Sequence, residues 1–174
     1  MSRCVIISAC PVSASLASAL RPGDTIIACD AGYRNCGPLH CRPDIIVGDF
    51  DTAPCPAQEG GDTIILPHVK DDTDTEYAAK LAAQKGFDEV LLLGALGGKR
   101  VEHTLANLCT GLGLEQHGIR AALQDERSRI TFVLPGESRR YPKEEFFYFS
   151  AFPMEGVGSA DQLAHRQTHL LCVI

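Results

Sequence analysis

Short apolar runs alternate with helical segments over the first two-thirds of the chain, and this alternation limits the fold more than any other feature. The runs predict strands at residues 4–8, 25–29, 45–47, 63–66, 89–93 and 120–124, with helices at 13–20, 73–86 and 101–117. Strands that alternate with helices form a mostly parallel sheet covered on both faces. The sequence therefore predicts an α/β fold, with a mostly parallel, Rossmann-like domain of three layers.

The helix that begins near Thr73 has the clearest sequence signals. Thr73 and Glu76 have the spacing of a capping box, alanines and a leucine form an apolar stripe, and Gly86 follows as a stop. The next run, 89–93, is apolar without interruption after its first residue, which predicts a central strand buried on both faces.

The pattern changes after about residue 125. Two predicted strands, 130–134 and 146–151, are separated by Pro135 and Gly136, and no helix lies between them. We therefore expect an α/β catalytic domain over residues 1–125 and a shortened β-strand unit, an incomplete β-sandwich, over residues 126–174. At least one sheet edge is expected to lack an evident partner.

Charge and hydropathy exclude several classes of function. The net charge is −6 and no basic run is present, which argues against sequence-independent binding of nucleic acid. No apolar stretch reaches the roughly 20 residues of a membrane span. The apolar run near the N-terminus is too brief for a secretory signal, so a cytoplasmic location is expected.

The eight cysteines include no Cys-x-x-Cys pair. Cys36, His40 and Cys41 lie close together, but a fourth zinc ligand at suitable spacing is missing. Reduced thiols are the expected state.

Acidic residues gather where the strands of a parallel sheet should end. Asp30 follows the second predicted strand, Asp49 and Asp51 follow the third, and an Asp71-Asp72-Thr73-Asp74 segment follows the fourth. Ligands of open α/β sheets bind at the carboxyl ends of the strands. We expect these three loops to converge on one crevice.

Such a gathering of carboxylates requires a compensating charge. Two carboxylates 4 Å apart repel by roughly 4 kcal/mol at an effective dielectric near 20. Magnesium takes hard oxygen ligands and commonly keeps phosphate oxygens in its shell. The alternative is that these aspartates form turns and cap a helix. The three loops together favour a magnesium–phosphate site.

Phosphate-binding groups are found beside these aspartates. Lys70 can bind phosphate as a point charge, and the loop containing Gly97 and Gly98 can offer backbone N–H groups. Arg100 and His103 begin the following helix and can reach the same crevice. Taken singly, each of these residues would be an ordinary surface group.

Taken in chain order, these segments resemble the thiamin pyrophosphokinase family. Order and spacing match over about residues 1–125. The motifs read Asp30-Ala31-Gly32, Pro43-Asp44-Ile45-Ile46-Val47-Gly48-Asp49-Phe50-Asp51-Thr52, Lys70-Asp71-Asp72-Thr73-Asp74-Thr75-Glu76, and Gly97-Gly98-Lys99-Arg100-Val101-Glu102-His103-Thr104 with Asn107.

The resemblance implies transfer of a diphosphoryl group from ATP to the hydroxyl of thiamin, giving thiamin diphosphate and AMP, in a homodimer. The resemblance implies that Asp49, Asp51 and Asp74 bind magnesium. It also implies that these three residues, together with Asp71 and Arg100, are catalytic. Other residues at positions that match the family motifs would, by the same resemblance, bind ATP or magnesium-bound phosphate. These are Asp30, Asp44, Lys70, Thr73, Gly97, Gly98, His103 and Asn107.

The chain departs from the family pattern chiefly at its end. Lys99 adds one residue before Arg100, the family's Ser-Asn-Glu segment is missing, and residues 160–174 do not resemble the family. Nucleotide and metal binding are thus expected to survive better than thiamin binding. Two alternatives remain: a catalytically impaired remnant that binds nucleotide and metal, and an aspartate-dependent phosphatase, which the Asp49-Phe50-Asp51-Thr52 segment suggests.

Overall fold

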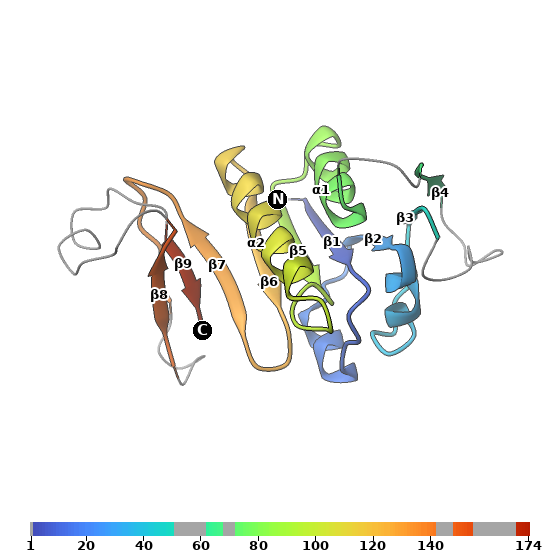
Figure 1. The fold of residues 1–174 in the computed structure, drawn as a ribbon, viewed down its shortest axis with the longest axis horizontal. Coiled ribbons are helices and arrows are strands. Elements are labelled where there is room, and N and C mark those ends of the chain that lie inside the picture. The colour runs from blue at the N-terminus through green and yellow to red at the C-terminus, as the bar shows by residue number, and fades with distance from the viewer. Residues whose placement is uncertain (1, 51–61, 68–71, 142–147, 155–169) are drawn as a thin grey trace.

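The structure is a computed structural model that describes residues 2–50, 62–67, 72–141, 148–154 and 170–174 (Figure 1). The α-helices are α1 (Asp74–Gln84) and α2 (Val101–Gln116), and two short 3-10 helices are η1 (Ala14–Ala19) and η2 (Asp30–Cys36). The strands are β1 (Arg3–Ile7), β2 (Thr25–Cys29), β3 (Ile45–Gly48), β4 (Asp62–Ile65), β5 (Glu89–Leu93), β6 (Arg120–Gln124), β7 (Arg129–Val133), β8 (Ser150–Pro153) and β9 (Leu170–Val173).

The nine strands of the described residues form one mixed sheet in the order β4-β3-β2-β1-β5-β6-β7-β9-β8. The pairs from β4 to β6 are parallel. The chain adds β2, β3 and β4 on one side of β1 and then returns to place β5 and β6 on the other side. The strand order therefore reverses between β1 and β5, which is the kind of point where open α/β sheets bind ligands.

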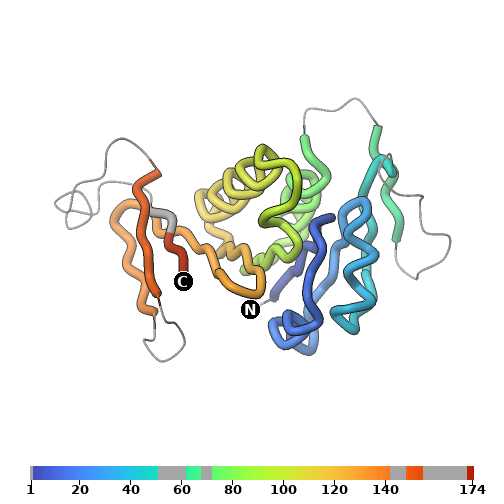
Figure 2. The backbone as a smooth tube through the Cα atoms, turned by 60° about the horizontal axis from the view of Figure 1, so that its bottom comes forward, coloured from blue at the N-terminus to red at the C-terminus, as the bar shows by residue number. Residues whose placement is uncertain are grey.

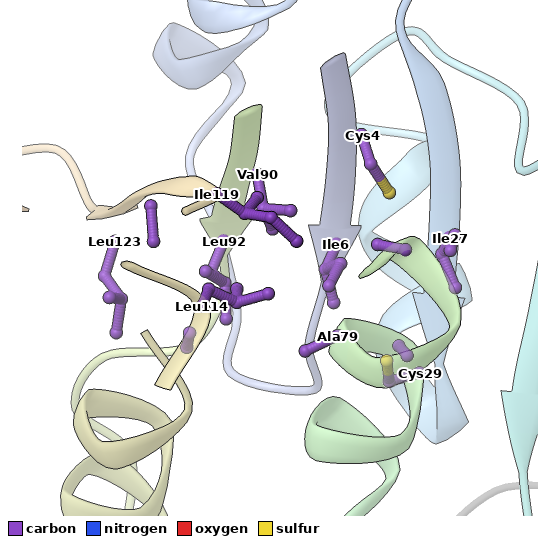
Figure 3. Close-up of a cluster of buried hydrophobic side chains, with 14 of the residues drawn as sticks. Cys4, Ile6, Ile27, Cys29, Ala79, Val90, Leu92, Leu114, Ile119 and Leu123 are labelled. Atoms are coloured by element: carbon purple, nitrogen blue, oxygen red, sulfur yellow. The ribbon is translucent and has the colours of Figure 1, made fainter. Parts of the chain in front are cut away.

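Strands in the middle of the sheet are buried on both faces. In β1, Cys4 and Ile6 pack into a cluster with α1 and α2, whereas Val5 and Ile7 pack into a second cluster with η1 and η2. Figure 3 shows the first cluster, where Ala79 of α1 and Leu114 of α2 approach the sheet. Alternation of side chains across the strand explains why these segments read as unbroken apolar runs.

The expected elements of the first 125 residues are found within a residue or two of their predicted bounds, apart from the short helical segments. Thr73 caps α1 by accepting a hydrogen bond from the Glu76 N–H at 3.1 Å. Gly86, with φ at 77°, follows the end of α1 as predicted. The segment expected as a helix at 13–20 is the 3-10 helix η1, and η2 was not predicted.

The strands beyond residue 125 continue the same sheet in the antiparallel sense. β7 pairs with β6, β9 with β7, and β8 with β9. In Figures 1 and 2 these strands extend one end of the molecule, opposite to β4. Phe132 of β7 is fully buried in the cluster formed with α1 and α2. The predicted β-sandwich is therefore not a separate sheet in the described residues, and the boundary at residue 125 stays a prediction.

Two expectations from the sequence concerned membranes and cysteines. Every helix in the described part of the chain is too short or too polar to cross a lipid bilayer. Cys36 is buried in the second apolar cluster, where it packs as a small hydrophobic side chain.

Part of the strand predicted at 146–151 lies outside the described residues, and β9 was not expected.

Candidate functional site

The carboxyl ends of β1, β2, β3 and β5 meet at one edge of the sheet because these strands run parallel. The chain segments that follow them bring together Ser8, Asp30, Asp49 and Gly94. The N-terminus of α1 joins the same edge: the Thr75 hydroxyl lies 2.8 Å from the Ser8 hydroxyl, and both residues are buried. We refer to this region as the carboxyl-end site.

Asp30 is the most constrained residue of the carboxyl-end site. It is only 7% exposed, its φ is 45°, and its Oδ1 has no hydrogen-bond partner in the described structure. A Cβ on Gly48 would lie 3.0 Å from the Asp30 Cα, so glycine allows the end of β3 to approach this backbone closely. A buried carboxylate oxygen without a donor is costly unless a ligand or cation satisfies it.

Asp49 and Asp74 flank Asp30. Asp49 directly follows Gly48, and the backbone carbonyl of Asp74 accepts a hydrogen bond from the Cys29 Sγ at 3.6 Å. Burial raises the pKa of the Cys29 thiol, and the negative charges of Asp74 and Asp30 raise it further. The Asp30 and Asp74 carboxylates therefore act on the same sulfur, as expected if these loops converge.

The loops on either side of the strand reversal are held by residues that sequence reasoning missed. The Asn35 side chain donates to the carbonyls of Ser8 and Cys10, both at 2.9 Å. Gly94 has φ of 63°, and a Cβ there would lie 2.5 Å from the Ser8 carbonyl oxygen. The signal that could have found Asn35 is its rarity, since the chain has only two asparagines.

The other asparagine, Asn107, supports the loop that follows β5. Its side chain is buried and donates to the Ala95 carbonyl at 2.7 Å. The Thr104 hydroxyl donates to the Gly97 carbonyl at 3.2 Å. Gly97 and Gly98 have φ of 76° and 85°. Asn107 thus supports the chain segment that leads into the glycine loop, and its expected role in nucleotide binding stays a prediction.

Arg100 and His103 lie at the start of α2, beside the glycine loop. The Arg100 Nε donates to a carboxylate oxygen of Glu102 at 2.7 Å, and this hydrogen bond lowers the pKa of Glu102. The Arg100 side chain is 66% exposed and His103 is also exposed, so both are accessible to a ligand at this edge.

Asp44 does not join the others. Its Oδ2 accepts a hydrogen bond from the Ile26 N–H at 2.7 Å, next to the first residue of β2. Asp44 precedes β3, so it lies at the amino ends of the parallel strands, at the opposite edge from Asp49. The four residues of β3 thus separate Asp44 from Asp49, and the expected role of Asp44 in binding the nucleotide stays a prediction.

Three predicted site residues, Asp51, Lys70 and Asp71, lie outside the described residues. Among the residues that are described, no three His, Cys, Asp or Glu side chains are grouped so that they alone could hold a metal ion. Thr73 uses its hydroxyl oxygen to cap α1. The aspartates at 30, 49 and 74, which follow β2 and β3 and begin α1, offer hard oxygen ligands of the kind that magnesium prefers.

The chain is similar to known proteins in sequence and in fold. Residues 16–123 match the family model described as thiamin pyrophosphokinase, catalytic domain. No curated protein sequence matches the chain. Thiamin pyrophosphokinase from Geobacillus thermodenitrificans superposes with a TM-score of 0.79 at 20% identity, covering 98% of this chain and 96% of that one. Thiamine pyrophosphokinase from Bacillus subtilis gives 0.75 at 24% identity, covering 88% and 74%.

Proposed function

Because the chain belongs to the thiamin pyrophosphokinase family, we propose that it transfers a diphosphoryl group from ATP to the hydroxyl of thiamin, giving thiamin diphosphate and AMP. In this reaction a bond forms between the thiamin oxygen and the β-phosphorus, and the bond from that phosphorus to the oxygen retained by AMP breaks. Catalysis of such a transfer depends on positioning the reactants and neutralising charge.

The observation that carries the proposal is the arrangement around Asp30. A buried carboxylate oxygen without a donor lies at the edge of the sheet where Asp49 and Asp74 also occur. Carboxylates that are drawn together around a bound phosphate group repel each other unless a cation lies among them. Their chemistry fits magnesium, which would neutralise the phosphate charge of ATP when bound.

We assign roles to the residues of the carboxyl-end site as follows. Asp49 and Asp74, with Asp51, would hold magnesium, and Asp30 would add a further carboxylate to the site. The backbone around Gly97 and Gly98 would receive phosphate, as helix N-termini and glycine loops do. Arg100, whose side chain is exposed, would pair with the phosphates. We also propose the roles that the family resemblance implies for Lys70, Asp71, Thr73 and His103.

Assembly into a homodimer is a further part of the proposal. Tyr148, Phe149 and Phe152 are 86%, 54% and 52% exposed in and beside β8. Exposed aromatic side chains near one another favour an interface with another chain. Sedimentation of the purified protein tests this part, and a monomer at micromolar concentration would contradict it.

The central test is an assay of AMP with ATP, thiamin and magnesium present. We expect AMP and thiamin diphosphate in equal amounts. Asp49→Asn should lower kcat/KM by about 100-fold or more, because it removes charge that positions the metal and phosphates. Asp88→Asn is the matched control, because Asp88 is exposed at the amino end of β5. The kcat/KM of this variant should stay within about twofold of that of the unmodified chain.

The two alternatives give different results in the same assay. A catalytically impaired remnant would bind magnesium–ATP in calorimetry but release no AMP. A phosphatase would release inorganic phosphate from a simple phosphoester without thiamin. Either result would contradict the proposed diphosphoryl transfer.

A further inference from the structure

Ser8, which directly follows β1, is joined by hydrogen bonds to three other elements of the carboxyl-end site. Its hydroxyl lies 2.8 Å from the hydroxyl of Thr75, the second residue of α1. Its N–H donates to the carbonyl of Leu93 in β5 at 2.8 Å, and its own carbonyl accepts a hydrogen bond from the Asn35 side chain of η2 at 2.9 Å. One buried serine therefore connects α1, β5 and η2 where the site is built.

The Thr75 hydroxyl belongs to a chain of hydrogen bonds that runs in one direction. The Cys29 thiol donates to the Asp74 carbonyl at 3.6 Å, so its single hydrogen is already used. Burial raises the pKa of the Cys29 thiol, and a hydrogen bond from the Thr75 side chain acts in the opposite sense. Thr75 therefore donates to the Cys29 sulfur, and the Ser8 hydroxyl donates to Thr75. The chain begins at the end of β1 and ends on the backbone of Asp74.

The buried side chains of α1 are small, and they are Thr75, Ala78, Ala79 and Ala82. Figure 3 shows Ala79 where α1 approaches the sheet. Apolar packing has no preferred direction, so alanines restrain the position of a helix along a sheet only weakly. A hydrogen bond depends on both distance and angle. The contact between Ser8 and Thr75 therefore fixes the N-terminal end of α1 against β1 in a way that the alanines do not.

We propose that Ser8 and Thr75 are positioning residues, which hold the N-terminus of α1 so that Asp74 meets the other ligands of magnesium. The inference rests on the proposed function, because it takes Asp74 as a magnesium ligand. Asp74 is the first residue of α1, and helix ends fray. Removing contacts that hold metal ligands in place typically costs about 10–100-fold in metal affinity. Neither hydroxyl is among the site residues that the sequence predicted.

Thr75→Val tests the proposal, because valine has a similar shape and lacks the hydroxyl. Calorimetry of the full chain should show about tenfold weaker binding of magnesium–ATP. In the AMP assay, the magnesium concentration that gives half the maximal rate should rise by a similar factor, whereas kcat at saturating magnesium should fall by less than about threefold. Thr75→Ser keeps the hydroxyl and should restore most of the affinity. Unchanged magnesium–ATP affinity in Thr75→Val would overturn the proposal.

Thr110→Val is the matched control. The Thr110 hydroxyl donates to the Ala106 carbonyl at 3.0 Å, within α2, so the same chemical change breaks no contact between elements. The affinity of this variant for magnesium–ATP should stay within about twofold of that of the unmodified chain. Equal weakening in Thr75→Val and Thr110→Val would show that the contact with Ser8 is not the cause, and the proposal would fail.

Ser8→Ala breaks the same contact from the other side, and it carries the comparison if Thr75→Val does not fold. It should also weaken magnesium–ATP binding by about tenfold. The double variant should be weaker than either single variant by no more than about twofold, because one contact is lost in all three. A loss of about a hundredfold in the double variant would show that the two hydroxyls act separately, against the proposal.

These measurements separate the inference from the proposed function. If the unmodified chain binds magnesium–ATP but forms no AMP, the proposed function fails, and the calorimetric comparison of the variants still decides the inference. If the unmodified chain forms AMP and Thr75→Val has the same magnesium dependence, the inference fails and the proposed function stands. Absence of magnesium–ATP binding by the unmodified chain would overturn both.

Discussion

At the scale of single residues, Asp30 combines features that normally destabilise a protein. Its backbone is in the left-handed region at φ of 45°, its side chain is buried, and one carboxylate oxygen lacks a donor. Such features persist when the surrounding structure imposes them, and they cluster at functional sites. Asp30 contrasts with Asp44, whose carboxylate is used by the backbone of β2.

These two aspartates should therefore respond in opposite ways to the same substitution. Asp30→Asn should leave the free energy of unfolding unchanged or raise it by up to about 1 kcal/mol, because a buried charge without a donor is removed. It should weaken magnesium–ATP binding. Asp44→Asn should cost about 1–2 kcal/mol through the weakened Ile26 hydrogen bond and leave nucleotide affinity unchanged. Urea unfolding and calorimetry measure both quantities, and a nucleotide defect in Asp44→Asn alone would reverse the assignment.

A second residue-scale prediction concerns the ion pair of Arg3 and Asp24, whose side chains are both 5% exposed. Burial acts to raise the pKa of Asp24, but hydrogen bonds from Arg3 and the Arg21 N–H outweigh it, so the pKa lies below its ordinary value. The pair therefore contributes stability above the unfolded-state pKa, and this contribution is lost as pH falls through the folded-state pKa.

Asp24→Asn should lower the free energy of unfolding at pH 7 by about 3 kcal/mol, because it leaves the buried Arg3 with only the more distant Glu89, at 4.0 Å, as a counter-charge. The difference between the two proteins should shrink as the pH falls below about 4. Urea unfolding at a series of pH values measures this. Asp88→Asn, at an exposed position, provides the control, and a difference that does not change with pH would contradict the argument.

At the scale of elements, α2 contains two glycines with different surroundings. A Cβ on Gly111 would lie 2.6 Å from Phe132 and 2.8 Å from Leu123, whereas a Cβ on Gly113 would meet nothing within 4 Å. Gly111 is thus what allows α2 to pack closely on β6 and β7.

Alanine at these two positions should have opposite effects on stability. Gly113→Ala should stabilise the protein by about 0.5–1 kcal/mol through helix propensity alone. Gly111→Ala gains the same propensity but overpacks the core, at a cost of about 1–3 kcal/mol. The two variants share a helix and a chemical change, so urea unfolding isolates the packing effect. Equal stabilisation of both would show that α2 does not need this close approach.

At the scale of the whole molecule, β7, which follows residue 125, contributes to the apolar cluster formed by the preceding part of the chain. Phe132 is fully buried in the cluster formed with α1 and α2, and β7 covers the edge of β6. We predict that a fragment of residues 1–125 has no cooperative thermal transition. Loss of a buried phenylalanine alone costs about 3–5 kcal/mol, against a typical total stability of about 5–15 kcal/mol.

Circular dichroism during heating and size-exclusion chromatography check the fragment against the full chain. A cooperative transition within a few degrees of the full chain would instead support two independent units divided near residue 125.

The sequence by itself determined the elements that depend on local pattern. The α1 cap at Thr73, the stop at Gly86 and the buried β5 all follow from short-range periodicity and capping chemistry. It also placed acidic residues at strand ends, because parallel strands carry their ligand loops at one edge.

Only the tertiary structure decided which of these residues meet. Asp44 lies in the same motif as Asp49, yet the two residues lie at opposite ends of β3, Asp44 at its amino end and Asp49 at its carboxyl end. The hydrogen bonds of Asn35 and the pairing of β9 with β7 each depend on contacts between distant parts of the chain. Local patterns carry no record of such contacts, because long-range pairing is set by the packing of the whole sheet and not by neighbours in sequence.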